Sequence, residues 1–434
     1  MTWLDWLVLT GTIAFIALYG WWKNRKSQAL NDYLRGGNEM PWHTIGLSIM
    51  ATQASAITFL STPGLAYEKG LRFVQFYFGL PLAMIVISAF IVPIYYRLKV
   101  FTAYEYLEQR FDLRVRLLGA SLFLIQRGLA AGITIYAPAI ILASIMGWSL
   151  QWTNLIIGGV VILYTVSGGT KAVSQTQKQQ MIVIMAGMLI AAGLIYTSLP
   201  KDVGLFEAAQ LAGALGRMNA VDFNFDLNHR YNLWSGLLGG FFLALSYFGT
   251  DQSQVQRYLT GRSLRESRLG LLLNGILKIP MQFMILWIGI LVFVFYLFVQ
   301  PPLSFNTPAL KELKHHRQHA AKVAQLQTQY DKACKEQQKA TIAFLKADRD
   351  WRRVQGTAKS ERHTVRQQRK IDFQRAARQR QRLRTQANQL LRQHIPQARK
   401  SKEADYIFIH FVVRWFPAGL LGLLLAVIKR RTPA

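Results

Sequence analysis

Long apolar runs, separated by shorter polar and charged segments, dominate the first 300 residues and return near the end of the chain. About nine of them reach the roughly 17–25 residues with which an α-helix crosses a bilayer. A compact soluble domain does not need repeated runs of this length, so the pattern predicts an all-α polytopic membrane protein. The predicted spans are 4–22, 43–66, 73–96, 116–147, 152–168, 179–199, 233–255, 270–299 and 406–428.

Basic and less basic connections between these spans alternate along the chain. The basic connections are 23–41, 97–115, 169–178 and 256–269, and the less basic ones are 67–72, 148–151 and 200–232. The positive-inside rule places the basic set in the cytoplasm. The sequence therefore predicts a multi-pass protein of the cell (inner) membrane, with its N-terminus outside and its C-terminus in the cytoplasm.

The positive charge of the chain is unevenly distributed. The 434 residues hold 51 Lys and Arg against 22 Asp and Glu, a net charge of +29. Residues 311–402 alone carry 25 Lys and Arg against 7 Asp and Glu, and they lie between the last two predicted spans. Much of the remaining charge is the bias that orients the spans, so the average composition is not evidence for a nucleic-acid partner, and none is expected.

The basic segment, 303–405, predicts a helical hairpin outside the membrane, between a membrane region at 1–302 and a last span with its tail at 406–434. Apolar or small residues recur at helical spacing in two runs, with Gly356-Thr357 as the turn between them. Two helices of roughly 30 residues would form an antiparallel hairpin about 45 Å long. A solvated hairpin with a basic face is favoured over a grip on RNA or anionic lipid, because Phe373 stands alone among the basic residues.

Hydroxyl and amide side chains crowd the middle of the second span, from Thr52 to Thr62, and Pro63-Gly64 closes it. Such a helix is a candidate for local unwinding, and the carbonyl groups that unwinding frees can coordinate a hard cation such as Na⁺. The alternative is that small hydroxyl residues only allow close helix packing.

Three charged residues, Arg127, Asp251 and Lys278, fall inside predicted spans, where ionisable groups are functional candidates. Asp251 could pair with Arg127 or with Lys278, and each charge could instead be structural. The chain has no Gly-x-x-x-x-Gly-Lys-Ser/Thr phosphate loop and no His-Glu-x-x-His pair, so neither an enzyme nor a metal site other than one for sodium is expected.

Five stretches together resemble one family of membrane proteins. They are Asp32-Tyr-Leu-Arg-Gly-Gly together with Pro63-Gly-Leu-Ala-Tyr-Glu-Lys-Gly70, Ile135-Tyr-Ala-Pro-Ala139, Tyr164-Thr-Val-Ser-Gly-Gly-Thr-Lys-Ala-Val173, Asp251-Gln-Ser-Gln-Val-Gln-Arg-Tyr-Leu259 and Phe416-Pro-Ala-Gly-Leu-Leu-Gly-Leu-Leu-Leu-Ala426. The chain resembles the sodium:solute symporter family, which includes sugar, iodide, vitamin and proline cotransporters. The resemblance implies a leucine-transporter-type inverted-repeat fold with an extra N-terminal helix, here carrying an inserted helical hairpin.

The same resemblance implies a function and a site. It implies a sodium-coupled symporter that imports a small organic solute by alternating access, with Na⁺ held by the backbone carbonyls of Ala51 and Ala54. The positions that match substrate-facing ones are Gln53, Ser55, Thr58, Asp251 and Gln252. A membrane-anchored sensor or scaffold, which would bind a partner through the hairpin, is the alternative from another class.

Two departures from the family pattern affect these expectations. After Ala426 the chain continues only to Ala434, without the paired serines that complete the sodium site in relatives and without the ninth and tenth core helices. The second repeat is therefore expected to be incomplete, as in a truncated or frame-shifted product. Gln177 stands where many relatives have an acidic residue on the sodium exit path.

Overall fold

The computed structural model describes residues 3–4, 6–8, 11, 38–54, 56–146, 148–226, 231–355 and 358–417. Within these ranges the chain is helical almost throughout, and its one β-bridge joins Met40 to Gly261. The predicted all-α fold is therefore confirmed. Four described stretches are long and apolar enough to cross a membrane: Leu71–Leu98, Leu113–Tyr136, Gln177–Thr197 and Leu264–Phe298.

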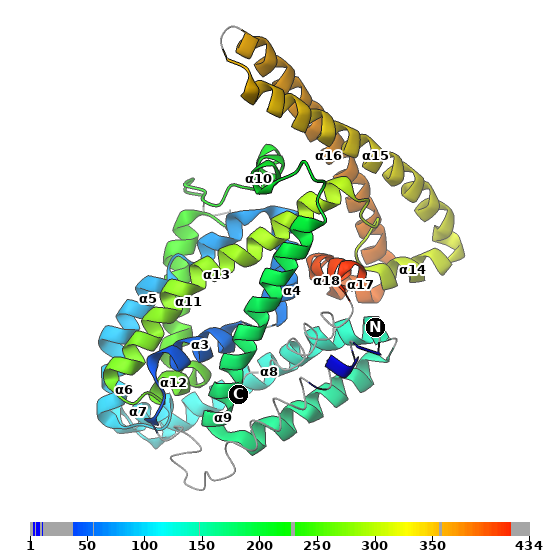
Figure 1. Cartoon of the computed structure of the whole chain (residues 1–434). Helices are drawn as coiled ribbons and strands as arrows, with labels where there is room; N and C mark the ends of the chain where they lie inside the picture. The colour runs from blue at the N-terminus through cyan, green and yellow to red at the C-terminus, as the bar shows by residue number, and fades with distance from the viewer. Residues whose placement is uncertain are drawn as a thin grey trace.

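A bundle built around α13 (Leu264–Phe298) forms the membrane body (Figure 1). The helix is the most buried of the candidate spans, and it packs against α3 (Trp42–Gln53), α4 (Ala56–Lys69) and α5 (Leu80–Val86). Close backbone approach makes this packing possible, since a Cβ atom added to Gly289 would lie 2.1 Å from the carbonyl oxygen of Pro63. Small residues allow such approach between membrane helices.

The other elements of the body follow the predicted order. They are η2 (Leu71–Tyr77), η3 (Ile87–Ile91), α6 (Val92–Leu98), α7 (Ala103–Arg110), α8 (Leu113–Met146), α9 (Leu150–Thr197), α10 (Leu205–Ala214), η4 (Ser235–Gly239), α11 (Gly240–Thr250) and α12 (Gln252–Leu259). Most of the first predicted span, 4–22, lies outside the described residues, and the last, 406–428, is described only to residue 417 as part of α18.

Helix α9 corrects one prediction made from the sequence. A loop between two spans is predicted at 169–178, and this is wrong, because helical structure continues from Leu150 to Thr197. Helix α9 contains Gly-Gly pairs at 158–159 and 168–169 but no proline, so every residue keeps the backbone N–H that a helix requires. Figure 1 shows that α9 changes direction instead, from a first part beside α8 to a second part beside α3 and α13.

The predicted hairpin is present and is longer than expected. Helices α15 (Arg317–Arg353) and α16 (Ala358–His394) contain 37 residues each, which corresponds to about 55 Å instead of 45 Å. They lie side by side and extend away from the bundle (Figure 1). Phe373 does not stand alone in space, because its ring stacks on that of Phe344 with centroids 5.6 Å apart. The predicted turn at 356–357 lies outside the described residues.

The hairpin is exposed along much of its length, as expected of a solvated hairpin, but it is also anchored to the body. The flanking helices are α14 (Thr307–His315), α17 (Pro396–Lys400) and α18 (Ala404–Trp415). Arg384 of α16 is 2% exposed and pairs with Glu403 at 2.8 Å, just before α18. It also donates a hydrogen bond of 3.1 Å to the hydroxyl of Tyr67 on α4, and its guanidinium lies 4.2 Å from the ring centre of Phe305. Burial of an arginine requires such partners.

Candidate functional site

The first helix break separates α3 from α4, in the middle of the predicted second span. Ala54 has an extended backbone, and its N–H donates to the carbonyl of Met50 at 3.0 Å. The helix axes on the two sides, Trp42–Gln53 and Thr58–Lys69, are bent by 62°. A helix end leaves carbonyl groups without partners in the helix, so the predicted unwinding is confirmed and it brings the carbonyls near Ala51 and Ala54 to the break.

Residues at this break differ in burial and in hydrogen bonding. Ala51 and Ala54 are buried, Thr58 is half-buried, and Ser55 lies outside the described residues. The side-chain oxygen Oε1 of Gln53 is buried and has no hydrogen-bond partner among the residues that the structure describes. A buried acceptor without a partner costs free energy, so this atom is a ready ligand for a cation or a polar solute.

A polar contact from α9 supports the α3 side of the break. The Oε1 atom of Gln177 accepts hydrogen bonds from the hydroxyls of Ser48 at 2.9 Å and Thr52 at 3.1 Å. Thr52 also donates to the carbonyl of Ser48 at 2.8 Å. Gln177, which is uncharged, therefore contacts α3 on the N-terminal side of the break and holds α3 against α9.

The second break, at Asp251, separates α11 from α12. Asp251 has an extended backbone, and its side chain accepts a hydrogen bond of 2.9 Å from the N–H of Ser253, which caps α12. Tyrosine hydroxyls donate to the last three carbonyls of α11. These bonds run from Tyr258 to Phe248 at 3.1 Å, from Tyr95 to Gly249 at 2.9 Å and from Tyr104 to Thr250 at 3.3 Å.

An ion pair adds to the closure of the second break. The guanidinium of Arg127 on α8 lies 2.7 Å from the Asp251 carboxylate, and the side chains are 17% and 9% exposed. Arg127 also donates to the hydroxyl of Ser253. Of the two pairings left open by the sequence, the structure thus contains Arg127 with Asp251. Lys278 lies elsewhere on α13, 2% exposed, with its Nζ 5.7 Å from the ring centre of Tyr77.

Gln252, the other residue predicted on this wall, bonds to backbone between α6 and α7. Its Oε1 accepts from the N–H of Ala103 at 2.8 Å, and its Nε2 donates to the carbonyl of Phe101 at 3.2 Å. Both ends of the amide are therefore occupied by the protein. The structure places Gln53 and Thr58 at one break and Asp251 and Gln252 at the other, and α3 packs against α12.

Sequence reasoning missed several polar groups near these breaks. Gln282, at the centre of α13, is fully buried, and neither polar atom of its amide has a partner. An amide inside an apolar span is a signal that could have found it. Tyr95, Tyr104 and Tyr258 carry no such signal, because tyrosine is common near membrane interfaces and only the fold shows which carbonyls its hydroxyl meets.

Two discontinuous helices within an apolar bundle, with polar groups at the breaks, are typical of secondary transporters. The model of the sodium:solute symporter family matches residues 33–321. The chain belongs to this family.

The human sodium/iodide cotransporter is 35% identical over 272 residues, which is 62% of this chain and 41% of the relative. The human sodium-coupled monocarboxylate transporter 1 is 35% identical over 273 residues, or 62% of this chain and 44% of the relative. The chain thus spans less than half the length of these curated relatives.

A solved structure agrees with the fold. A Na⁺-coupled sialic acid symporter in a substrate-bound outward-open state has a TM-score of 0.69 and 21% sequence identity, and the match covers 99% of this chain and 70% of that one. The leucine-transporter-type fold predicted from the sequence is therefore confirmed.

Proposed function

We propose that this chain acts in sodium-coupled symport, in which Na⁺ entry drives import of a small organic solute by alternating access. The observation that carries the proposal is the break between α3 and α4, where the Oε1 atom of Gln53 is buried without a partner. Family membership supports this function over that of a membrane-anchored sensor or scaffold.

In the proposed site, Na⁺ takes the backbone carbonyls of Ala51 and Ala54 as ligands. Carbonyl and amide oxygens are the donors that a hard cation prefers, and the break exposes them in the middle of a span. The solute lies beside Gln53, Ser55 and Thr58, and the Oε1 atom of Gln53 also contributes to the Na⁺ site. Asp251 and Gln252, at the second break, form a second wall.

The relatives narrow the proposed class of solute. Two of them transport iodide and monocarboxylates according to their names, and both are small monovalent anions. We therefore expect a small anion, preferably a carboxylate, to be the solute of this chain. The proposed orientation in the inner membrane keeps the basic connections in the cytoplasm and the hairpin outside.

Uptake by the full chain in proteoliposomes tests the proposal. An inward Na⁺ gradient should drive accumulation of radiolabelled acetate, lactate or iodide, and an equal K⁺ gradient should not. Replacement of Gln53 by leucine should abolish the sodium dependence. Equal uptake in both gradients, or uptake no higher than in protein-free liposomes for every anion tried, would contradict the proposed function.

A further inference from the structure

A pocket of about 400 Å³ lies where the hairpin meets the body, between α16, the end of α13 and the segment after α10. This volume is within the range of small-molecule sites. Three arginines and three glutamines supply its long polar side chains: Arg217, Arg378, Arg380, Gln337, Gln374 and Gln381. No carboxylate lines it.

Two of the arginines of this pocket, Arg380 and Arg217, are held in place by uncharged groups. Arg380 is 6% exposed and donates to the carbonyl of Tyr296 at 2.9 Å. Arg217 donates to the carbonyl of Tyr67, and its guanidinium lies 4.0 Å from the ring centre of Phe293. Within the described part of the chain, no carboxylate lies within 4.0 Å of Arg217, Arg378 or Arg380.

The positive charges of the pocket lack a counter-charge inside it. Burial lowers the pKa of Arg217 to about 10, and the charge of Arg380 contributes in the same direction. Glu68 of α4 acts on Arg217 in the opposite direction but does not line the pocket. Arg217 still carries its charge at neutral pH, so an anion that enters would relieve the repulsion between the guanidinium groups.

A buried amide provides an independent indication of a ligand. Gln337 on α15 is 1% exposed, and within the described ranges neither its Nε2 nor its Oε1 has a hydrogen-bond partner. The Nε atom of Arg217 is likewise buried without a partner. Buried polar atoms in folded proteins usually have partners, and a bound ligand with acceptor oxygens would supply them for the two N–H groups.

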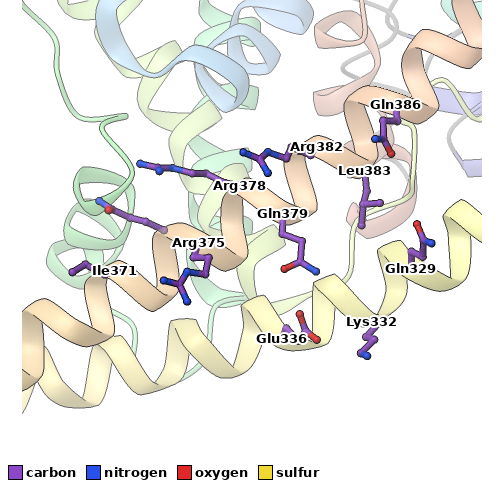
Figure 2. Close-up of a pocket in the computed structure, with 11 residues that line it drawn as sticks. Gln329, Lys332, Glu336, Ile371, Arg375, Arg378, Gln379, Arg382, Leu383 and Gln386 are labelled. Atoms are coloured by element: carbon purple, nitrogen blue, oxygen red, sulfur yellow. The ribbon is translucent and has the colours of Figure 1, made fainter.

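A basic groove adjoins the pocket on the hairpin. It has a volume of about 750 Å³ and shares Gln374 and Arg378 with the pocket. Figure 2 shows its lining from both helices, with Arg375, Arg378 and Arg382 on α16 and Lys332 on α15. Glu336 is its one carboxylate, so the groove raises the local concentration of anions at the pocket.

We propose that this pocket binds an oxyanion group, a phosphate or a carboxylate, in contact with Arg217, Arg378, Arg380 and Gln337. Guanidinium groups bind such anions through paired N–H donors, and Gln337 can add another donor. The group belongs either to a soluble anion or to a lipid headgroup, because Phe293 and Leu215 give the pocket an apolar wall. The inference stands apart from the proposed transport function, since it involves neither helix break.

The test uses the purified full chain and inorganic phosphate or acetate as the probe. Calorimetric titration should show saturable binding, and Arg378→Gln should weaken it by at least about tenfold, the effect of losing one charge-assisted hydrogen bond. Arg392→Gln is the matched control, because Arg392 is an exposed arginine on the same helix that does not line the pocket. No binding of either anion to detergent-solubilised protein or of anionic lipid, or equal effects of the two substitutions, would overturn the proposal.

Two further measurements sharpen the result. Gln337→Leu should leave the anion-free protein at least as stable, because the amide has no partner to lose, and should weaken phosphate binding several-fold. Unchanged binding in this variant would remove Gln337 from the site. The chain could instead be stabilised against thermal unfolding by nanodiscs that contain phosphatidylglycerol, but not by phosphatidylcholine nanodiscs, and fail to bind free phosphate. This result would identify a lipid headgroup as the source of the oxyanion, provided that Arg378→Gln abolishes the stabilisation.

Discussion

The two helix breaks of the body differ in how the protein satisfies them. At Asp251 the carbonyls that end α11 receive tyrosine hydroxyls, α12 is capped, and Arg127 neutralises the carboxylate. At Ala54, Gln177 binds α3 on the N-terminal side of the break, and the side-chain oxygen of Gln53 has no partner among the described residues.

This difference separates a closed break from an open one. Irregular backbone at membrane depth is tolerated where protein groups or a ligand complete its hydrogen bonds. The break at Asp251 obtains them from the protein and is expected to contribute to stability. The break at Ala54 still has a free acceptor and is expected to contribute to binding. The predictions below test this division.

Replacement of Asp251 by alanine should have the largest effect on stability. It leaves the mostly buried charge of Arg127 without its carboxylate and removes the cap of α12, and loss of one partner of a buried ion pair typically costs about 3–5 kcal/mol. Thermal or denaturant unfolding of the purified protein in detergent measures this. Adding Arg127→Met should recover part of the loss, because it removes the unpaired charge.

Asp202→Ala is the control for this prediction. Asp202 is 83% exposed and lies 4.0 Å from Arg349 of the hairpin, so its removal should change stability little. Equal stability of the Asp251 and Asp202 variants would show that the second break is not closed by its ion pair.

The next largest effect on stability is expected for Tyr258, a residue of α12 whose hydroxyl donates to a carbonyl group at the end of α11. Tyr258 is fully buried, and Tyr258→Phe leaves the carbonyl of Phe248 without this donor at a cost of about 1–3 kcal/mol. Tyr104→Phe should cost less, because its hydrogen bond to Thr250 is longer and more exposed. The same unfolding measurement compares the two, and the reverse order would contradict the role of Tyr258 as a buried cap.

The sequence predicts the open break better than the closed one. The hydroxyl-rich run from Thr52 to Thr62 is a local signal, and it indicates the break between α3 and α4 correctly. The Pro63-Gly64 pair, expected to close the span, instead lies inside α4, which continues to Lys69. The groups that close the break at Asp251 come from α6, α7, α8 and α12, and only the packing of these helices shows that Arg127, not Lys278, lies within reach. The hairpin shows the same limit, since its helical period is readable in the sequence but the burial of Arg384 against α4 is not.

A smaller effect should follow from Gln177→Leu. Ser48 and Thr52 lose a shared acceptor, but Thr52 keeps its bond to the carbonyl of Ser48, so the cost should be about 1 kcal/mol. Gln177→Glu keeps acceptor oxygens at the same place and should lose less stability at neutral pH than the leucine variant. A greater loss in the glutamate variant would mean that the contact does not tolerate a negative charge.

Replacement of Gln53 by leucine should have the smallest effect on unfolding, within about 0.5 kcal/mol, because the oxygen it removes has no partner in the protein. Its effect should appear in sodium binding instead. A ligand that binds only the folded state raises the midpoint of thermal unfolding, so NaCl should stabilise the unsubstituted chain more than KCl at equal ionic strength. The leucine variant should lose this difference. Gln337→Leu removes an equally unpartnered amide from the hairpin and should keep the sodium response, while Gln53→Leu should keep the phosphate response. A sodium response unchanged in the Gln53 variant would mean that the Gln53 oxygen does not take part in sodium binding. Ligand binding would then no longer distinguish the open break at Ala54 from the closed break at Asp251.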